Sequence, residues 1–258
     1  GMNTLPHWNF FNYEEAINFL KENPGRYVFK PSGSLLAEQK GILFIGNDES
    51  GCDLIEVLTH NKVAWSKKYK KFQLQKFVQG VEVAVGAFFN GKDFIRPINI
   101  NFEHKKLFPS DIGPHTTEMG TLMYWCNPNV IFKTTLEKIK EPLAKSGYVG
   151  YIDINCIANN AAIYPLEFTA RFGYPTTSIQ LDGILSPTGE WLSRLAKGEQ
   201  FDLRTKKGFQ IGVVVAVPPF PYNDKKAAEI YRDLSIIFKK TNLEGIHLGD
   251  VKLVNGDW

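Results

Sequence analysis

The sequence contains few cysteines and little net charge. Its 258 residues include three cysteines, Cys52, Cys126 and Cys156, and its formal net charge is +3. The cysteines are odd in number and lack the spacing of a metal motif, so we expect reduced thiols and a cytoplasmic protein. A charge this close to zero gives no reason to expect nucleic acid or an anionic membrane as a partner.

Long apolar runs, repeats and low-complexity tracts are also missing. The apolar run at residues 211–217 is far shorter than the roughly 20 residues that span a bilayer. No charged-then-apolar leader opens the chain, so we do not expect secretion. The composition, 43% apolar and 22% charged, is typical of a soluble globular enzyme. The length allows one large domain or two intimate ones.

The pattern of the chain indicates a mixture of helices and strands. Asn12 followed by Glu15 is a capping-box pattern, and an apolar stripe follows it, so we expect a helix over residues 13–22. The predicted strands cover residues 27–30, 41–45, 74–78, 81–89, 151–157, 163–169 and 211–217, with a hairpin loop at 31–39 and a long loop at 103–120. The other predicted helices cover about 132–143, ended by Gly147, and segments up to about 195.

The predicted hairpin of strands 151–157 and 163–169 carries two acids. Alternate side chains of a strand share a face, so Asp153 and Asn155 point one way, and Glu167 and Thr169 also share a face. Two acids and two neutral oxygens converging on one face suit a hard cation such as Mg²⁺. A three-residue tip at 159–161 brings Asp153 opposite Glu167, whereas a two-residue turn puts them on opposite faces. The alternative is a plain antiparallel hairpin with one solvated face.

Several blocks follow one another in the order of a known family. Residues 75–82 (QKFVQGVE), 104–106 (HKK), 113–120 (GPHTTEMG), 147–150 (GYVG) and 166–175 (LEFTARFGYP) resemble blocks of phosphoribosylamine–glycine ligase, and residues 212–216 and 247–249 resemble parts of its C-terminal lobe. That family makes purine precursors and belongs to the ATP-grasp superfamily. The resemblance covers nearly the whole chain.

The resemblance implies an α+β ATP-grasp fold with mostly antiparallel sheets. Two subdomains that clasp a nucleotide are expected at residues 12–73 and 74–195, with a small β-rich lobe at 196–258. It also implies an ATP-dependent carboxylate–amine ligase that uses Mg²⁺, or Mn²⁺ in its place. A carboxylate would attack the γ-phosphate of ATP to give an acyl phosphate, and an amine would then expel phosphate. Glycine and phosphoribosylamine are the implied substrates.

The resemblance also implies roles for individual residues. The residues implied to bind the nucleotide are Lys30 and Lys40 at the phosphates, Gln75, Lys76 and Val78 at adenine, and Glu82 at ribose. The residues implied to hold magnesium are Asp153, Glu167, Thr169 and Asn155. The residues implied to act in catalysis are Arg171, which would steady the transferring phosphoryl group, and His104 and Lys105, which would meet substrate or the γ-phosphate.

The chain departs from the family at several positions. Thr169 stands in place of a metal-binding Asn, and the phosphate loop at residues 34–39 is longer and poor in glycine. Thr117 and Glu118 replace two glycines of the family's Gly-Gly-Met-Gly stretch, and Tyr174 and Thr176 replace an Asp and a Glu. The family's N-terminal domain has no counterpart, and the C-terminal lobe is shortened. Either the substrates differ from glycine and phosphoribosylamine, or a separate chain completes the acceptor pocket.

These departures leave a second hypothesis open. The chain could be a catalytically weakened ATP-grasp protein that binds a nucleotide and acts as a regulatory module. A third hypothesis, RNA binding, rests only on the lysine-rich run at residues 67–71, for which a solvated face is the simpler interpretation.

Overall fold

The chain forms two compact units in the computed structural model. One unit contains residues 1–81 and 157–166, and the other contains residues 82–156 and 167–258. The structure describes residues 1–32, 43–217, 220, 229, 234–239, 242–249 and 251–252. The subdomain boundaries expected from the sequence, after residues 73 and 195, stay predictions.

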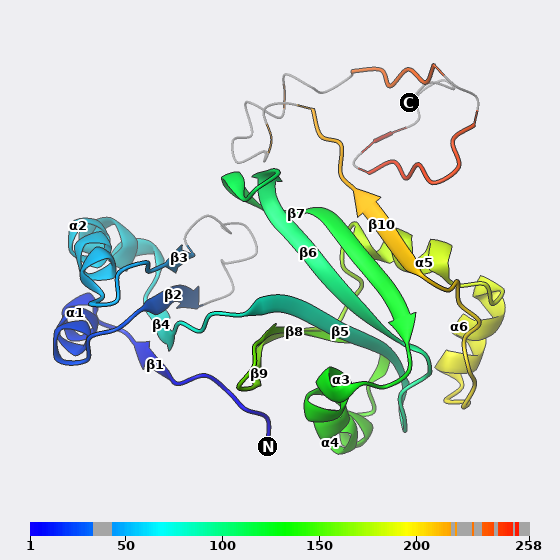
Figure 1. Ribbon diagram of the computed structural model, residues 1–258, viewed down its shortest axis with the longest axis horizontal. Coiled ribbons are helices and arrows are strands. Elements are labelled where there is room, and N and C mark those ends of the chain that lie inside the picture. Colours follow the sequence, from blue (N-terminus) through cyan, green and yellow to red (C-terminus); the bar gives the residue numbers. More distant parts are fainter. Residues whose placement is uncertain are drawn as a thin grey trace. The chain divides into compact units, whose positions relative to one another are not determined.

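The first unit is built on a four-stranded antiparallel sheet with the order β1-β4-β2-β3. Its strands are β1 (His7–Phe10), β2 (Tyr27–Ser32), β3 (Phe44–Ile45) and β4 (Lys71–Lys76), and its helices are α1 (Tyr13–Glu22) and α2 (Cys52–Lys68), as Figure 1 shows. One apolar core joins both helices to the sheet. Its fully buried members include Leu20 of α1, Leu58 of α2, Phe29 of β2 and Phe72 of β4. Burial of each such side chain stabilises the unit by about 1.5–3 kcal/mol.

Helix α1 has the bounds that the sequence predicts. Its Asn12 cap, however, accepts a hydrogen bond from the backbone N–H of Glu14 at 2.8 Å, instead of forming the predicted box with Glu15. Helix α2 was not predicted, because its apolar residues do not gather strongly on one face; Leu54 and Leu58 are its buried residues.

The second unit is built on a six-stranded sheet with the order β10-β7-β6-β5-β8-β9. Its strands are β5 (Val81–Asn90), β6 (Ile98–Phe108), β7 (Ile112–Cys126), β8 (Val149–Ala158), β9 (Ile163–Thr169) and β10 (Phe209–Val213). Strands β5, β8 and β9 each contribute residues to both units. Figure 1 shows β5, β6 and β7 side by side in this sheet.

Helices cover both faces of the second sheet near the end of β5. Phe88 and Phe89 are neighbours on that strand and therefore point to opposite faces. The ring of Phe88 packs against Trp191 with 4.8 Å between centroids, whereas Phe89 packs against Phe94, which contacts Phe132. Phe132 lies on α3 (Val130–Thr134), which is followed by the 3-10 helix η2 (Leu136–Ile139) and by α4 (Lys140–Ser146). Trp191 lies on α6 (Thr188–Ala196), and α5 (Thr176–Gly183) precedes it in the chain.

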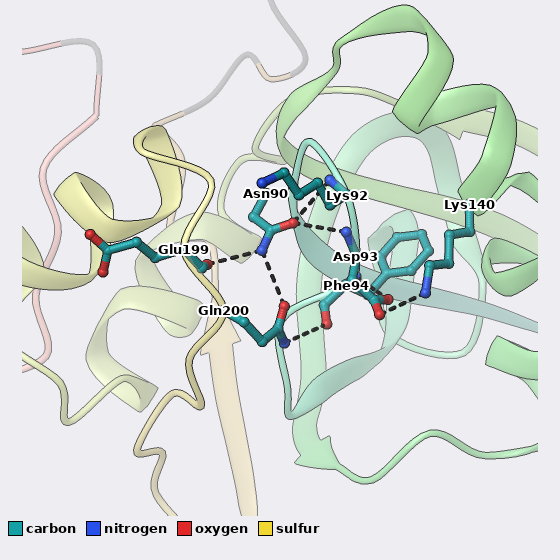
Figure 2. A network of polar contacts seen from close by, with 7 residues as sticks. All are labelled: Asn90, Lys92, Asp93, Phe94, Lys140, Glu199 and Gln200. Carbon is teal, nitrogen blue, oxygen red and sulfur yellow. Dashed lines mark hydrogen bonds and ion pairs between the residues drawn. The ribbon is translucent and has the colours of Figure 1, made fainter.

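A buried asparagine ties the turn after β5 to the segment that follows α6 (Figure 2). Asn90 is 3% exposed, and its Oδ1 accepts hydrogen bonds from the backbone N–H groups of Lys92 and Asp93 at 3.0 and 2.8 Å. Its Nδ2 donates to the carbonyl of Glu199 at 2.9 Å and to Oε1 of Gln200 at 3.1 Å. One side chain therefore holds together two stretches of chain that are far apart in the sequence.

The prediction of a long loop at residues 103–120 is wrong. Strands β6 and β7 pair through most of this region, from Ile98 opposite Cys126 to Phe108 opposite Ile112. The turn between them contains Ser110 and Asp111, both with positive φ. The Pro, Gly, His and Thr residues that suggested a loop belong instead to an irregular hairpin with two register shifts.

Other boundaries moved by a few residues. Strand β4 covers Lys71–Lys76 and not 74–78, and β10 covers Phe209–Val213 and not 211–217. The predicted helix at 132–143 is divided into α3, η2 and α4, and Gly147 ends α4 with a φ of 70°, as expected. In the described residues no helix is long and apolar enough to cross a membrane.

Candidate active site

Polar side chains gather on one face of the six-stranded sheet. The ammonium of Lys105 on β6 contacts the carboxylates of Glu82 on β5 and of Glu103 on its own strand, with 3.4 Å between Lys105 Nζ and Glu103 Oε2. Side chains two residues apart on a strand share a face. Asn99 and Asn101, which precede Glu103 on β6, therefore lie on this face too.

The hydroxyl of Tyr151 places β8 on the same face. Tyr151 Oη donates to Oδ1 of Asn99 at 3.2 Å and accepts a hydrogen bond from Nε2 of Gln180 on α5 at 2.8 Å. Gly86 on β5 leaves the space for it, because a Cβ at Gly86 would lie 1.9 Å from Tyr151 Oη. Asp153 is two residues further along β8, so its carboxylate shares the face of Asn99 and Tyr151.

Lys105 is a fixed cation between two acids. Burial lowers its pKa, but attraction to Glu82 and Glu103 and the hydrogen bonds to them outweigh burial and raise the pKa. For Glu103 the effects are reversed: burial raises the pKa of its carboxyl, and attraction to Lys105 lowers it. The three side chains therefore form a charged cluster that is held in place before any ligand binds.

Asp153 is the buried acid of the predicted metal set. It is 6% exposed, and burial raises its pKa to about 7, with a further contribution from Glu103. Hydrogen bonding from the Thr169 side chain and attraction to Arg171 act in the opposite direction. The structure thus brings Asp153, Thr169 and Arg171 together.

The position of Glu167 follows from Thr169. The Thr169 side chain reaches Asp153, and Glu167 lies two residues earlier on β9, so all three share a face. The charge of Glu167 also raises the pKa of Glu103, which is consistent with a position of Glu167 on this face.

The hairpin tip has two residues, the second of the two alternatives that the sequence left open. The N–H of Asn159 donates to the carbonyl of Ala162 at 3.0 Å, so two residues lie between them. Unbroken pairing from such a tip would put Asp153 and Glu167 on opposite faces. The interaction of Thr169 with Asp153 therefore requires an irregularity between the tip and Thr169.

The donor set fits a hard cation. Asp153, Asn155, Glu167 and Thr169 supply two carboxylates and two neutral oxygens, the ligand types that Mg²⁺ prefers. The raised pKa of Asp153 marks a buried carboxylate that a nearby cation would stabilise in its charged form. Within the described ranges, no group of three or more His, Cys, Asp and Glu side chains could hold a metal ion, so the neutral oxygens or a ligand's phosphates would have to complete the shell.

Arg171 is anchored by its neighbour. Its Nη1 donates to the carbonyl of Phe172 at 3.0 Å, and the Phe172 ring stacks on Tyr151 with 5.5 Å between centroids and 9° between planes. The chain after β9 is thereby attached to the polar face, and Arg171, which is exposed, is near enough to Asp153 for its charge to lower the pKa of that acid.

His104 does not join this cluster. It is adjacent to Lys105 on β6, so its side chain points to the other face of the sheet. Its Nε2 lies 2.9 Å from the carbonyl of Phe108, and its Nδ1 lies 3.8 Å from Asp111. Lys105 is therefore the member of this pair that lies with the acids.

Two acids of the cluster, Glu103 and Glu118, were missed as site residues. Glu118 is 7% exposed and accepts a hydrogen bond from Oγ1 of Thr176 at 2.8 Å. Burial raises its pKa to about 8, and Glu103 adds to the shift. Both acids lie in the region interpreted as a loop; alternation around Lys105 could have indicated Glu103, but nothing local marks Glu118 as buried.

The residues implied to bind the nucleotide lie mainly in the first unit. On its sheet Lys30 is opposite Gln73 and Val28 is opposite Gln75, so Lys30 and Gln75 share a face. Lys76 is on the other face, with its Nζ 4.5 Å from the centroid of the Tyr27 ring. Val78 follows β4 and is half-buried. Lys40 lies outside the described residues.

Comparison with protein families gives one match that covers most of the chain. A family model described as phosphoribosylglycinamide synthetase, ATP-grasp (A) domain, matches residues 1–177. Phosphoribosylamine–glycine ligase of Streptococcus pneumoniae is 28% identical over 240 residues, which are 89% of this chain and 56% of that protein. The enzyme of the same name from Listeria innocua is 28% identical over 232 residues, 86% of this chain and 54% of that protein. The chain thus spans about half the length of these curated relatives.

Solved structures are similar in fold. Phosphoribosylamine–glycine ligase of Thermotoga maritima matches with a TM-score of 0.66 and 24% identity, over 86% of this chain and 57% of that one. N5-carboxyaminoimidazole ribonucleotide synthetase of Thermus thermophilus matches with a TM-score of 0.53 and 18% identity, over 85% and 55%. With the family match, these similarities confirm the expected α+β ATP-grasp fold.

Proposed function

The chain belongs to the phosphoribosylglycinamide synthetase ATP-grasp (A) domain family, and from this premise we propose that it is an ATP- and magnesium-dependent ligase that joins a carboxylate to an amine. The observation that carries the proposal is the polar face of the second unit. On that face Lys105 contacts Glu103, and the Thr169 side chain and the charge of Arg171 both lower the pKa of Asp153. Such a mixture of fixed cations and oxygen ligands suits a polyphosphate that arrives with a cation.

The reaction would proceed in two steps. An oxygen of the substrate carboxylate attacks the γ-phosphorus of ATP, the bond to the bridging oxygen breaks, and ADP leaves with the bonding pair. The amine then attacks the acyl carbon of the acyl phosphate, loses a proton, and expels inorganic phosphate. Neither step needs a nucleophile from the protein, so catalysis would come from positioning and from neutralisation of charge.

The residues of this chain would share these tasks. Asp153 and Glu167, with Asn155 and Thr169, would hold magnesium, which supplies charge neutralisation and Lewis acidity at the phosphates. Lys105 and Arg171 would contact the transferring phosphoryl group. The residues proposed to bind ATP are Lys30 and Lys40 at the phosphates, Gln75, Lys76 and Val78 at adenine, and Glu82 at ribose, with Mn²⁺ able to replace magnesium.

The names of the relatives suggest glycine and phosphoribosylamine as substrates and a role in purine biosynthesis. Because the chain spans about half of their length, the substrates belong to the proposal. The same holds for a separate chain that completes the acceptor side, and for a cytoplasmic location.

Release of ADP tests the proposal. Purified chain with ATP and Mg²⁺ is assayed against glycine and other amino acids, each with a panel of amines. Release that requires Mg²⁺, a carboxylate and an amine together is the expected result. Absence of turnover for every pair, with ATP still bound, would favour the catalytically weakened nucleotide-binding module. That second function is favoured by Thr169, because a threonine hydroxyl would be a weaker metal ligand than the Asn that the family has at this position.

A further inference from the structure

A local irregularity of the β6–β7 hairpin turns Glu118 into the interior. His104 lies opposite Gly120 and Lys106 lies opposite His115, so the single residue Lys105 faces the four residues 116–119. Such a bulge re-aims side chains, and bulges are common beside active sites. The hydroxyl of Thr116 anchors it by donating to the carbonyl of Lys105 at 2.8 Å.

Among the residues that the structure describes, Glu118 in this bulge has no ion pair, although attraction to Lys105 partly offsets the rise in its pKa. It accepts a hydrogen bond from the neutral hydroxyl of Thr176, at 2.8 Å. The nearby cation, Lys105, already contacts Glu82 and Glu103. Burial and the charges of Glu103 and Asp153 both raise the pKa of Glu118. This corner of the polar face is therefore short of positive charge.

One buried hydroxyl beside this corner has an unused hydrogen-bonding atom. Thr121 is 3% exposed and lies directly opposite Glu103 on the neighbouring strand. In the described part of the chain, Thr121 Oγ1 has no hydrogen-bond partner. A hydroxyl oxygen can accept a hydrogen bond from a ligand. Native proteins keep few buried polar groups unsatisfied without a ligand or water to satisfy them.

The chemistry of these groups favours an organic cation. A primary ammonium has three N–H donors and one positive charge, which match the carboxylates of Glu118 and Glu103 and the hydroxyl of Thr121.

We propose that Glu118, with Glu103 and Thr121, binds the ammonium group of a small-molecule substrate. The inference rests on the proposed ligase function, and it assigns Glu118 as a residue that determines specificity. The family that the chain resembles has glycine at this position, which offers no carboxylate. The ammonium could belong to an amino acid or to the amine co-substrate, and the two sources can be told apart by experiment.

Calorimetric titration of the full chain, with ADP and Mg²⁺ present, tests the inference by two matched pairs of probes. Glycine is compared with glycolate, and ethylamine with ethanol, so that each pair differs in the ammonium group. We expect at least one ammonium probe to bind and its partner to bind about tenfold more weakly or not at all. If glycine binds and ethylamine does not, the bound ammonium group belongs to an amino acid. If ethylamine binds, the ammonium group belongs to the amine co-substrate.

Two variants and one control assign the binding to this corner. Glu118→Gln should weaken binding of the ammonium probe by at least about tenfold. The amide oxygen of the new side chain can still accept the hydrogen bond from Thr176, so the fold should be kept. Thr121→Val removes a hydroxyl that has no hydrogen-bond partner among the described residues, so it should keep the fold and still weaken binding of the probe. Glu141→Gln, which changes an exposed acid of α4, should leave binding unchanged.

The results separate this inference from the proposed function. Failure of both ammonium probes to bind, or equal binding to wild type, E118Q and T121V, overturns the inference even if ADP release is observed. Ammonium binding that both variants lose, in a chain that releases no ADP with any pair, overturns the ligase and leaves the ammonium site standing.

Discussion

The side chain of Lys105 on β6 is ion-paired with Glu82 on the neighbouring strand β5 and also contacts Glu103. The side chains of Lys105, Glu82 and Glu103 are 27%, 37% and 16% exposed, so water screens this cluster in part. When one partner of such a partly buried pair is removed, the remaining charge loses its compensation.

Lys105→Ala should therefore lower both stability and activity. We expect the free energy of unfolding to fall by about 1–2 kcal/mol at pH 7, because Glu82 and Glu103 lose their shared cation. ADP release should fall by at least about a hundredfold if Lys105 contacts the phosphoryl group. Urea unfolding and the ADP assay check the two effects. Lys106→Ala, one residue on and pointing to the other face, is the control, and equal losses in the two variants would contradict the assignment.

Asp153→Asn should stabilise the free protein and abolish its metal-dependent binding. The folded state raises the pKa of Asp153 from 3.8 to about 7, so above pH 7 the protein bears the cost of a buried charge. The amide removes that charge, and we expect a gain of about 1–2 kcal/mol in the free energy of unfolding at pH 8. Thermal unfolding at pH 8 without nucleotide, followed by titration with Mg-ATP, measures both. A variant that is less stable and still binds Mg-ATP would speak against a metal ligand at this position.

Glu118 should make the folded state less stable as pH rises. Folding raises the pKa of its carboxyl from the ordinary value of 4.5 to about 8. Its stabilising contribution is therefore complete below pH 4.5 and is lost as pH rises through about 8. Between these values Glu118→Gln should show a flatter stability curve than wild type, with a difference of about 2 kcal/mol near pH 8. Chemical unfolding at a series of pH values checks this, with Glu141→Gln as a control that should follow the wild-type curve.

The sequence predicted the fold and the shared face of the polar residues on β8 because the signals for them are local. The alternation of side chains along β8 indicated that Asp153 and Asn155 share one face of the strand. Asn12 and the apolar stripe that follows it predicted the bounds of α1. The ordered family blocks indicated the ATP-grasp fold, which the family match confirms. These signals depend on residues within a few positions of one another.

The remaining features depend on contacts between distant segments. Burial of Glu118 requires both the bulge opposite Lys105 and the hydroxyl of Thr176, 58 positions away. His104 and Lys105 are equally suitable as site residues until β6 is known to be a strand, which sends adjacent side chains to opposite faces. The register of the β8–β9 hairpin could not be predicted from its tip. The hydrogen bond between Asn159 and Ala162 closes a two-residue tip, and regular pairing from such a tip would put Asp153 and Glu167 on opposite faces.

The network of Figure 2 gives a test of stability that is separate from activity. Asn90→Ala removes four hydrogen bonds of a buried amide and leaves the carbonyl of Glu199 without this donor. We expect a loss of about 2–4 kcal/mol in the free energy of unfolding. The ion pair of Lys140 with Asp93 in the same figure is 2.6 Å long, but its side chains are 42% and 51% exposed. Lys140→Met should therefore cost no more than about 0.5 kcal/mol, and a larger loss from it than from Asn90→Ala would contradict this ranking.

Glu167→Ala should remove magnesium-dependent nucleotide binding with almost no loss of stability. Glu167 is exposed, and we expect the free energy of unfolding to change by less than about 0.5 kcal/mol. In the proposed site it supplies one of the two carboxylates that hold the cation, so the affinity for ATP in Mg²⁺ should fall by at least about tenfold. Nucleotide titrations with Mg²⁺ and with EDTA separate metal-dependent from metal-independent binding. Glu141→Ala, another exposed acid of the same unit, is the control. If Glu167→Ala bound Mg-ATP as tightly as wild type, β9 would not contribute to a metal site, and the proposed placement of the phosphates beside Asp153 would have to be given up.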